Sequence, residues 1–392
     1  MFGCRHLGHL LIVVGLTAVP VIMAMIFRMS TLYSHELYPI VSSGTVCGMQ
    51  KFDQSNPWSG DPDERFSGPV IAVIGAGMAG LTAARLLTER GCRVTVFDKG
   101  RRPGGRMSSR WYPDLAFDHG CQYFTAHDRR FQLHVEAWEE AGVVSRWAGR
   151  RAACAHGVFS LVEDEVVRYV GVPEMQSVAA HLARGLDVQT DCQVVSLDAS
   201  ASQWALKTTG TAPGRFDAVL ISVPAPQAAA LLPASISFGD RVRGLEMQAC
   251  WAIMAAYDRD LELGFDAAHI SGNPLVWICR NDRKPGRVGD ECWTLHASPD
   301  WSRNHLEEDR DEVTGKLLAA FHALAGLSRV QPVFVRAHRW RYASPAHALE
   351  DGYLWDPAAR IGVCGDWCHS PRVEGAFLSG WMLAEQVLAH LV

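Results

Sequence analysis

The sequence has no strong excess of charge of either sign and very few lysines. Across 392 residues, 37 lysines and arginines oppose 42 aspartates and glutamates, so the formal net charge is −5. This balance argues against a protein built mainly to bind nucleic-acid phosphates. With 48% hydrophobic and 20% charged residues, the chain is too apolar to be disordered throughout. Its length suffices for two or three domains.

Cysteine is also sparse. The eleven cysteines are scattered, and no two have the C-x-x-C spacing of a zinc ribbon or a thioredoxin-like site. Cys364, Cys368 and His369 lie close together in the sequence, but a matching second pair of ligands is missing. We therefore expect no metal site, and reduced, mostly buried thiols in a reducing compartment.

One long hydrophobic run stands near the start of the chain. Residues 7–27 contain no Lys, Arg, Asp or Glu, and a helix of that length spans ~30 Å, roughly the hydrocarbon thickness of a bilayer. Arginines flank the run on both sides, which leaves its orientation open. Three interpretations of residues 1–29 stay open: a membrane anchor, translation that starts later at Met29 or Met49, and a cleaved signal peptide.

A strand–turn–helix pattern begins at residue 70. Residues 70–74 are apolar and mostly β-branched, which predicts a strand buried on both faces. A helix is predicted over 81–90, with Gly91 as its C-terminal cap, and a second strand over 93–97. The turn between the first strand and the helix consists of Gly75, Ala76, Gly77, Met78, Ala79 and Gly80.

In this setting, a G-x-G-x-x-G turn is typical of dinucleotide binding. Gly75 allows the tight turn, Gly77 has no Cβ to block a pyrophosphate, and Gly80 lets the helix pack closely on the strand. The start of the helix offers free N–H groups and a partial positive charge to the phosphates. Asp98, at the end of the second strand, is placed to accept hydrogen bonds from a ribose.

The residues after Asp98 distinguish FAD from NAD. From Lys99 to Arg106 the sequence is Lys-Gly-Arg-Arg-Pro-Gly-Gly-Arg, which resembles the segment that flavoproteins of the amine-oxidase superfamily place against FAD. The resemblance implies a close approach of the cofactor at Gly105. It also implies neutralisation of the pyrophosphate by Arg106, whose guanidinium suits bidentate contacts. Lys99 and Met107 complete this set of predicted cofactor contacts.

A second cofactor signal lies near the C-terminus. A strand predicted over 360–364 leads to Asp366, which is placed to bind the ribityl or diphosphate end of FAD. An amphipathic helix is predicted over 381–391, and backbone amides just before it could face the pyrimidine carbonyl of the flavin. The candidate contacts in this part of the chain are Gly365, Asp366, Glu374, Gly375 and Ala376, with the amides assigned to Gly375 and Ala376.

The order of these elements predicts an α/β FAD-binding Rossmann-like domain built from discontinuous segments, with an inserted α+β substrate domain. The segment 186–197 has the short-strand pattern of the element that contacts adenine in such proteins, with Val194 making a backbone contact. The predicted parts are a linker (30–67), three FAD-binding segments (68–112, 171–226 and 333–392), a flavin-contact segment of the substrate domain (113–170) and the substrate domain itself (227–332).

From residue 70 to the C-terminus, the chain resembles the bacterial renalase-like flavoproteins of the amine-oxidase superfamily. The blocks that carry this resemblance are 104–109, 118–126 with 128–131, 277–281 with 284–287, 293–297, 337–340, 364–368 and 372–375. The resemblance implies non-covalent FAD and oxidation of isomeric dihydronicotinamide dinucleotides, the 2- and 6-dihydro forms of NAD(P). Electrons then pass to O2, giving NAD(P)+ and hydrogen peroxide.

The resemblance also assigns site residues. It places Gln122, Tyr123 and Phe124 beside the isoalloxazine and leaves His119 as a local structural residue. Candidate substrate contacts are Trp277, Arg280, His296 and Trp340, since aromatic rings could sandwich a nicotinamide and an arginine could hold a phosphate. No side chain is expected to act as a catalytic acid or base, because hydride transfer from a dihydropyridine yields an aromatic cation without proton transfer.

Two other functions stay open. The first is oxidation of amines, for which many relatives hold a lysine near flavin N5; only Lys284 and Lys316 lie in the right part of this chain, and Lys284 is predicted in a turn. The second is a flavin-binding redox module without turnover. The expected partners are the dinucleotide and O2, in the cytoplasm, with a tether to the inner membrane if 7–27 is translated. The preference for NAD or NADP forms and the oligomeric state are left open.

Overall fold

The computed structural model describes residues 68–200, 203–210, 214–327 and 330–392. The predicted anchor or misplaced start and the predicted linker both lie outside these residues. Within the described ranges, no helix combines the length and the apolar character needed to cross a membrane.

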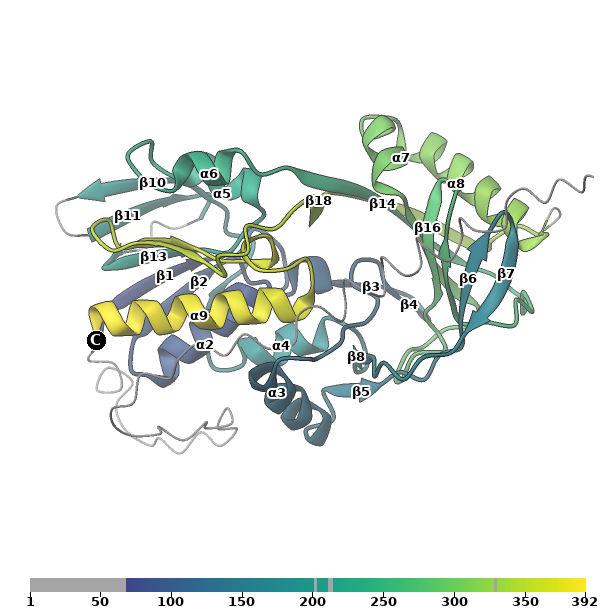
Figure 1. Ribbon diagram of the computed structural model, residues 1–392, viewed down its shortest axis with the longest axis horizontal. Helices are drawn as coiled ribbons and strands as arrows, with labels where there is room; N and C mark the ends of the chain where they lie inside the picture. Colours follow the sequence, from purple (N-terminus) through teal and green to yellow (C-terminus); the bar gives the residue numbers. More distant parts are fainter. Residues whose placement is uncertain (1–67, 201–202, 211–213, 328–329) are drawn as a thin grey trace, which may run out of the picture. The chain divides into compact units, whose positions relative to one another are not determined.

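A six-stranded sheet forms the first layer of the fold, and its strands come from distant parts of the chain (Figure 1). Their order is β19-β20-β13-β1-β2-β9, and all neighbours are parallel except β19 and β20. The strands are β1 (Val70–Ile74), β2 (Arg93–Phe97), β9 (Asp187–Gln189), β13 (Ala218–Ile221), β19 (Leu354–Asp356) and β20 (Ile361–Val363). The predicted Rossmann-like domain of discontinuous segments is confirmed.

Both faces of this sheet are covered, as the apolar sequence of β1 predicts. Ile71 and Val73 pack into the core shared with helices α2 (Met78–Glu89) and α9 (Val373–Leu391). Ala72 and Ile74 point to the opposite core, because successive side chains of a strand alternate between faces. That second core is closed by strands β10 (Val194–Ser200), β11 (Gln203–Thr208) and β12 (Arg215–Phe216) and by helices α5 (Ala225–Leu231) and α6 (Gly239–Arg243).

The inserted part is built on a seven-stranded sheet, ordered β18-β14-β17-β16-β15-β6-β7. It is antiparallel except for the pair β15 and β6. Its strands are β6 (Arg151–Ala155), β7 (Val158–Val162), β14 (Met247–Ala256), β15 (Ala267–Ile270), β16 (Leu275–Arg280), β17 (Cys292–Ala297) and β18 (Phe334–Pro345). Helices α7 (Pro299–Asn304) and α8 (Arg310–Ala325) belong to the same part (Figure 1).

Short elements connect the two sheets. They are the 3₁₀ turns η1 (Gly105–Met107) and η2 (Asp366–Cys368), the hairpin β3 (Ser109–Tyr112) and β4 (Leu115–Asp118), the pair β5 (Val144–Arg146) and β8 (Tyr169–Gly171), and helices α3 (Arg129–Glu140) and α4 (Ser177–Ala183). The end of β4 brings residues 118–124 to the boundary between the dinucleotide fold and the inserted sheet.

Two predicted element boundaries were wrong. The last helix begins at Val373, eight residues before the predicted start at 381, because its glycines are needed for close packing and do not end the helix. The segment 186–197 is two strands, β9 and β10, that belong to different sheets.

Helix α9 approaches α2 so closely that one position admits only glycine. A Cβ on Gly380 would lie 2.1 Å from the carbonyl oxygen of Ala79. We expect Gly380→Ala to lower the free energy of unfolding by about 1–3 kcal/mol or more, because backbone must move to relieve the clash. Urea denaturation would measure it. The matched control is Gly315→Ala in α8, where an added Cβ meets nothing. It should raise stability by about 0.4–1 kcal/mol, and equal effects at both sites would contradict the packing argument.

Candidate functional site

The glycine turn after β1 has the geometry that its sequence predicts. Gly75 has φ +110°, and its N–H donates to the carbonyl of Phe97 at 2.7 Å. A Cβ on Gly80 would lie 2.0 Å from the carbonyl oxygen of Gly75, so this glycine lets α2 begin directly against the turn. A Cβ on Gly77 would meet no protein atom within 4 Å. Gly77 therefore faces open space, where a ligand can approach the backbone.

Asp98 is held rigidly at the end of β2. Its Oδ2 accepts the N–H of Ala76 at 2.6 Å, and its Oδ1 accepts the N–H of Gly100 at 2.6 Å. The carboxylate is thus fixed beside the glycine turn, in the position expected for a ribose contact. The neighbouring Lys99 is exposed.

The second glycine-rich turn packs directly on the first. The N–H of Gly104 donates to the carbonyl of Ala76 at 2.8 Å, and a Cβ on Gly105 would lie 3.6 Å from the Cα of Gly77. Met107 is buried beneath this turn. Gly104 and Gly105 have φ of +136° and +53°, which favour glycine. Within 4 Å a Cβ on Gly105 would meet only the Cα of Gly77, so a diphosphate could approach the backbone at this point.

Arg106 and Asp366 contact each other. The guanidinium donates two hydrogen bonds to the carboxylate, at 2.8 and 2.6 Å, and a third to the carbonyl of Ala343 at 3.1 Å. The sequence assigned the two residues separately to the pyrophosphate and to the ribityl or diphosphate end. The structure joins them into one charge-paired unit, which brings η1, η2 and β18 together.

The start of α9 changes the assignment of two predicted contacts. Because the helix begins at Val373, the N–H of Ala376 donates to the carbonyl of Arg372 at 3.0 Å and cannot face a ligand. The Gly375 amide lies among the first helical residues, which have no intrahelical partner. Glu374 accepts the N–H groups of His127 and Asp128 at 2.6 and 2.7 Å, so its carboxylate anchors this loop.

The inserted sheet holds the backbone at the end of β4. The N–H of Asp118 donates to Oδ1 of Asn281 at 2.9 Å, and its carbonyl accepts the Thr294 hydroxyl at 3.1 Å. One residue later, the carbonyl of His119 accepts both Nε2–H of His296 at 3.1 Å and Nε1–H of Trp340 at 3.0 Å.

The polar contacts of His296 and Trp340 are with backbone, and their role in substrate binding stays a prediction. They were expected to contact substrate, but the polar atoms recorded in these bonds fix the backbone of residue 119. The His119 ring stacks on Trp340 with centroids 5.0 Å apart. Burial, with His338 and Arg110 nearby, lowers the pKa of His119 to about 2, and burial lowers the pKa of His296 to about 4. Both imidazoles are neutral at physiological pH and are weak bases.

A buried ion cluster lies beside this backbone. Oδ2 of Asp118 accepts hydrogen bonds from Nζ of Lys284, at 3.2 Å, and from a guanidinium nitrogen of Arg287. Nζ of Lys284 also donates a hydrogen bond to Oε1 of Gln122, at 3.1 Å. Burial alone would raise the pKa of Asp118, but Lys284 and Arg287 lower it well below its usual range. Lys284 does lie in a turn, as predicted, yet its side chain is 0% exposed.

Aromatic rings surround the next residue of the segment. Tyr123 lies 5.7 Å from Trp277 and 5.8 Å from Trp147, between ring centroids, and Arg168 lies over the Tyr123 ring at 5.4 Å. Lys284 is 6.0 Å from the ring of Trp147. The structure thus brings Trp277 to predicted flavin contacts. It also adds Trp147, an isolated tryptophan whose role no local motif indicates.

Arg280 was predicted to hold a substrate phosphate, and its contacts do not support that role. Its guanidinium pairs with Asp282 at 2.9 Å, Asp260 at 3.3 Å and Glu291. Three carboxylates around one guanidinium make the surroundings of Arg280 negatively charged, which disfavours the binding of a phosphate.

The remaining predicted contacts are buried in the core. Val194 begins β10 and packs with Phe97, near the end of β2. Phe124 pairs with Tyr169 through backbone hydrogen bonds and ring stacking. No cluster of three or more His, Cys, Asp or Glu suited to a metal occurs in the described part of the chain.

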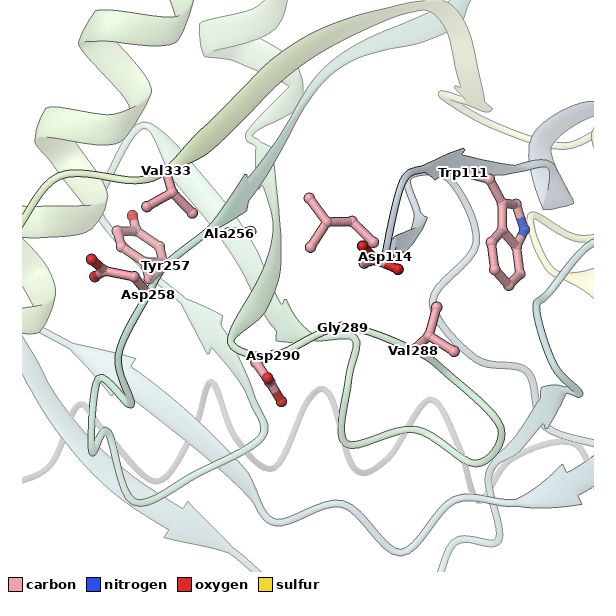
Figure 2. A pocket seen from close by; sticks show the side chains of 10 residues that line it. Trp111, Asp114, Ala256, Tyr257, Asp258, Val288, Gly289, Asp290 and Val333 are labelled. Atoms are coloured by element: carbon pink, nitrogen blue, oxygen red, sulfur yellow. The ribbon is translucent and has the colours of Figure 1, made fainter.

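A surface hollow of about 660 Å³ lies apart from these groups (Figure 2). Trp111, Asp114 and Leu115 of the β3–β4 hairpin line it together with residues at the end of β14 and in the 288–290 loop. None of the predicted cofactor or substrate residues lines this hollow. It is not the candidate site.

The parallel sheet and its glycine turns are those of a dinucleotide-binding fold, into which a second, mostly antiparallel sheet is inserted. Residues 73–137 match the family model of the NAD(P)-binding Rossmann-like domain, and residues 142–388 match that of flavin containing amine oxidoreductases. Because the second match spans more than half of the chain, this protein belongs to the flavin-containing amine oxidoreductase family.

Proteins similar in sequence have diverse names. The chain is 36% identical over 123 residues to hydroxyneurosporene desaturase of Rubrivivax gelatinosus, covering 26% of this chain and 23% of that protein. It is 44% identical over 62 residues to protoporphyrinogen oxidase 2 of Arabidopsis thaliana, covering 16% and 12%. These matches thus span less than a quarter of either relative.

Solved structures share the fold. A protein named as a protoporphyrinogen oxidase from Exiguobacterium sp. 255-15 superposes with a TM-score of 0.67 at 12% identity, covering 82% of this chain and 99% of that one. Putrescine oxidase bound to putrescine superposes with a TM-score of 0.65 at 13% identity, with the same coverage. At such identities the likeness concerns the fold alone.

The cofactor of this family is FAD, and the residues present fit it. Gly77 leaves open backbone that a diphosphate could approach, and Asp98 is fixed beside the glycine turn, where it could accept a ribose hydroxyl. Arg106 would lie beside the cofactor together with Asp366, which balances its charge. The start of α9 adds the positive end of a helix.

Gly77 and Gly80 offer a test that separates cofactor binding from folding. We expect Gly77→Ala to weaken FAD binding at least tenfold, because its methyl group fills the space left for the pyrophosphate. The unfolding free energy of the apoprotein should change by less than about 1 kcal/mol. Gly80→Ala should instead destabilise the apoprotein, since its Cβ would lie 2.0 Å from a carbonyl. Flavin-fluorescence titration and urea denaturation measure the two effects, and normal FAD affinity in Gly77→Ala would contradict the assignment.

The buried histidines predict loss of stability in acid. The pKa of His296 is about 4 in the folded state, below its ordinary value near 6.5, so the unfolded chain binds more protons between these pH values. Stability should therefore fall as the pH falls from 6.5 towards 4. In His296→Gln, which keeps an N–H donor, this fall should be smaller by roughly 3 kcal/mol. Urea denaturation across this range measures the slope. The exposed His347→Gln is the control, and identical slopes in the two variants would refute the assignment.

Proposed function

We propose that this protein is an FAD-dependent oxidase of isomeric dihydronicotinamide dinucleotides, the 2- and 6-dihydro forms of NAD(P). Each turnover would consume one dihydropyridine, one proton and one O2, and would yield NAD(P)+ and hydrogen peroxide. Bound FAD supplies the two-electron acceptor and its reoxidation by O2. The chain's own residues need only hold a planar ring against the cofactor and exclude water.

In this proposal the cofactor contacts come from both glycine-rich turns and from the C-terminal segment. They are Gly75, Ala76, Gly77, Met78, Ala79, Gly80, Asp98, Gly105, Arg106, Met107, Val194, Gly365, Asp366 and Gly375. Gln122, Tyr123 and Phe124 would lie beside the isoalloxazine, with Trp277 and Trp147 as aromatic walls for the substrate. Arg280, His296 and Trp340 are left out of the substrate contacts, because their polar groups are bonded elsewhere.

The observation that supports the dinucleotide most is the charge state of the groups around residues 118–124. His119 and His296 are neutral, and Asp118 is held as a carboxylate by two cations. None of these groups is a good base at neutral pH, which suits a substrate that gives up a hydride without losing a proton. The single carboxylate and two cations also leave positive charge near the site, which opposes a protonated amine.

Amine oxidation is the second candidate, and one observation favours it. Lys284 is buried against Gln122, and the rings of Tyr123, Trp147 and Trp277 lie nearby. A lysine beside the flavin and an aromatic enclosure are features expected of an amine oxidase. Against this, Lys284 already donates to Asp118 and Gln122.

Anaerobic mixing of the purified holoprotein with candidate reductants distinguishes these functions. We expect a mixture of 2- and 6-dihydro-NAD and -NADP to bleach the oxidised flavin band within seconds, with NAD(P)+ formed stoichiometrically. Ordinary 4-dihydro-NADH and a panel of primary amines and polyamines should reduce it at least 100-fold more slowly.

The other outcomes are equally informative. Rapid bleaching by an amine, without a response to the dinucleotides, would replace the proposal with the amine oxidase. Reduction by dithionite alone would indicate a redox module without turnover. Trp277→Ala supports the substrate assignment only if it slows reduction by the isomers while FAD stays bound.

A further inference from the structure

The buried ion cluster beside Gln122 contains more cations than anions. Asp118 contributes one negative charge, and Lys284 and Arg287 contribute two positive charges. All three side chains are at most 1% exposed. Transfer of an unpaired cation from water to a protein interior costs several kcal/mol or more, so such an excess calls for a compensating anion nearby.

No neighbouring carboxylate supplies that anion. Among the residues that the structure describes, Asp118 is the carboxylate recorded in an ion pair with Lys284 or Arg287. Three other carboxylates have cations of their own. Asp366 pairs with Arg106, Asp282 with Arg280, and Asp266 with Arg150.

Neutral groups accept hydrogen bonds from only some of the N–H donors of Lys284 and Arg287. Lys284 donates to Oε1 of Gln122 and to Oδ1 of Asn281, and Arg287 donates to the carbonyls of Gly171 and Pro285. Nε of Arg287 is buried and has no hydrogen-bond partner. These contacts solvate the cations, but they add no negative charge.

The cluster lies close to the predicted cofactor region. The N–H of Cys121 donates to the carbonyl of Arg106 at 2.9 Å, in the second glycine-rich turn. Lys284 and Arg106 both act electrostatically on the thiol of Cys121, so both side chains lie near this residue. Gln122 follows directly and accepts from Lys284.

We propose that the Lys284–Arg287–Asp118 cluster is a built-in positive counter-charge for the negative charge that the cofactor gains on reduction. Hydride transfer from a neutral dihydropyridine leaves a positive charge on the product and a negative charge on the acceptor, with no proton lost or gained. A fixed cation in a dry environment stabilises the acceptor's new charge without reorganisation. Lys284 and Arg287 thus act through space as positioning residues that tune the acceptor. This inference rests on the FAD site of the proposed function, but not on which substrate is used.

Substitution of Lys284 provides the test. Lys284→Met leaves Asp118 and Arg287 as a balanced pair, so the cluster loses its excess charge and the fold keeps one buried ion pair. Sulfite, a small anion that bleaches oxidised flavin when it binds, probes the same stabilisation of negative charge. We expect Lys284→Met holoprotein to bind sulfite at least tenfold more weakly than the unaltered protein. The two-electron midpoint potential should fall by the corresponding amount, about 30 mV.

Lys316→Met is the matched control. Lys316 is a half-exposed lysine on α8 that pairs with Glu308, so its loss should leave sulfite binding and potential unchanged. Arg287→Met provides a second route to the same neutral cluster and should act in the same direction as Lys284→Met. If one of these two variants fails to bind FAD, the other still tests whether the cluster stabilises negative charge on the cofactor.

A change of less than twofold in sulfite affinity for both variants, equal to that of Lys316→Met, would overturn the proposal. Neither measurement uses a dihydropyridine or an amine. Failure here would therefore remove the counter-charge and leave the substrate question to the anaerobic reduction experiment.

Discussion

Asp118 is the residue on which the junction between the dinucleotide fold and the inserted sheet depends. Its carboxylate is buried against Lys284 and Arg287, and its backbone is bonded to Asn281 and Thr294. Removal of one partner from a buried ion pair typically costs about 3–5 kcal/mol, because the other charge stays buried without compensation. The end of β4 is therefore held by the inserted sheet much more firmly than an ordinary loop.

The attachment of Asp118 to the inserted sheet also fixes the positions of residues 119–122. Once Asp118 is fixed, the carbonyl of His119 meets the donors of His296 and Trp340, and Gln122 reaches Lys284. A Cβ on Gly120 would lie 2.2 Å from the carbonyl oxygen of Arg106, so the segment also touches the second glycine-rich turn. The segment is thus held between the two parts of the fold, and a shift of the inserted sheet would move it relative to the cofactor turns.

The sequence predicted best those features that depend on neighbouring residues. The turn from Gly75 to Gly80 and Asp98 could be assigned because strand, turn and helix follow one another within thirty residues. The start of α9 was missed because the two glycines in its first turns resemble a loop, whereas Gly375 and Gly380 are required by the close approach of Ser370 and Ala79. Local composition cannot show contacts of that kind.

The surroundings of the candidate substrate residues depend on contacts between distant parts of the chain and could not be predicted from the sequence. His296 and Trp340 have the right chemistry to contact a nicotinamide, but β17 and β18 bring both to one carbonyl. Lys284 precedes a proline and a glycine, which is typical of an exposed turn. Its burial follows from Asp118, which is 166 residues away in the sequence. Of the three aromatic residues that meet here, Tyr123 and Trp277 were identified from the sequence. Trp147 was not, because no motif surrounds it.

In the proposed reaction, the cluster's excess charge would have opposite effects on the two products of hydride transfer. It would attract the negative charge gained by the acceptor and repel the positive charge formed on the nicotinamide. Coulomb energy falls with distance, so the sign of the net effect depends on which new charge lies closer to Lys284. Lys284 contacts Gln122, which is predicted to lie beside the flavin. Its ammonium group also lies over the ring of Trp147, which is proposed to contact the substrate. The same cation can therefore favour reduction of the acceptor and weaken binding of the oxidised product, which would couple hydride transfer to product release.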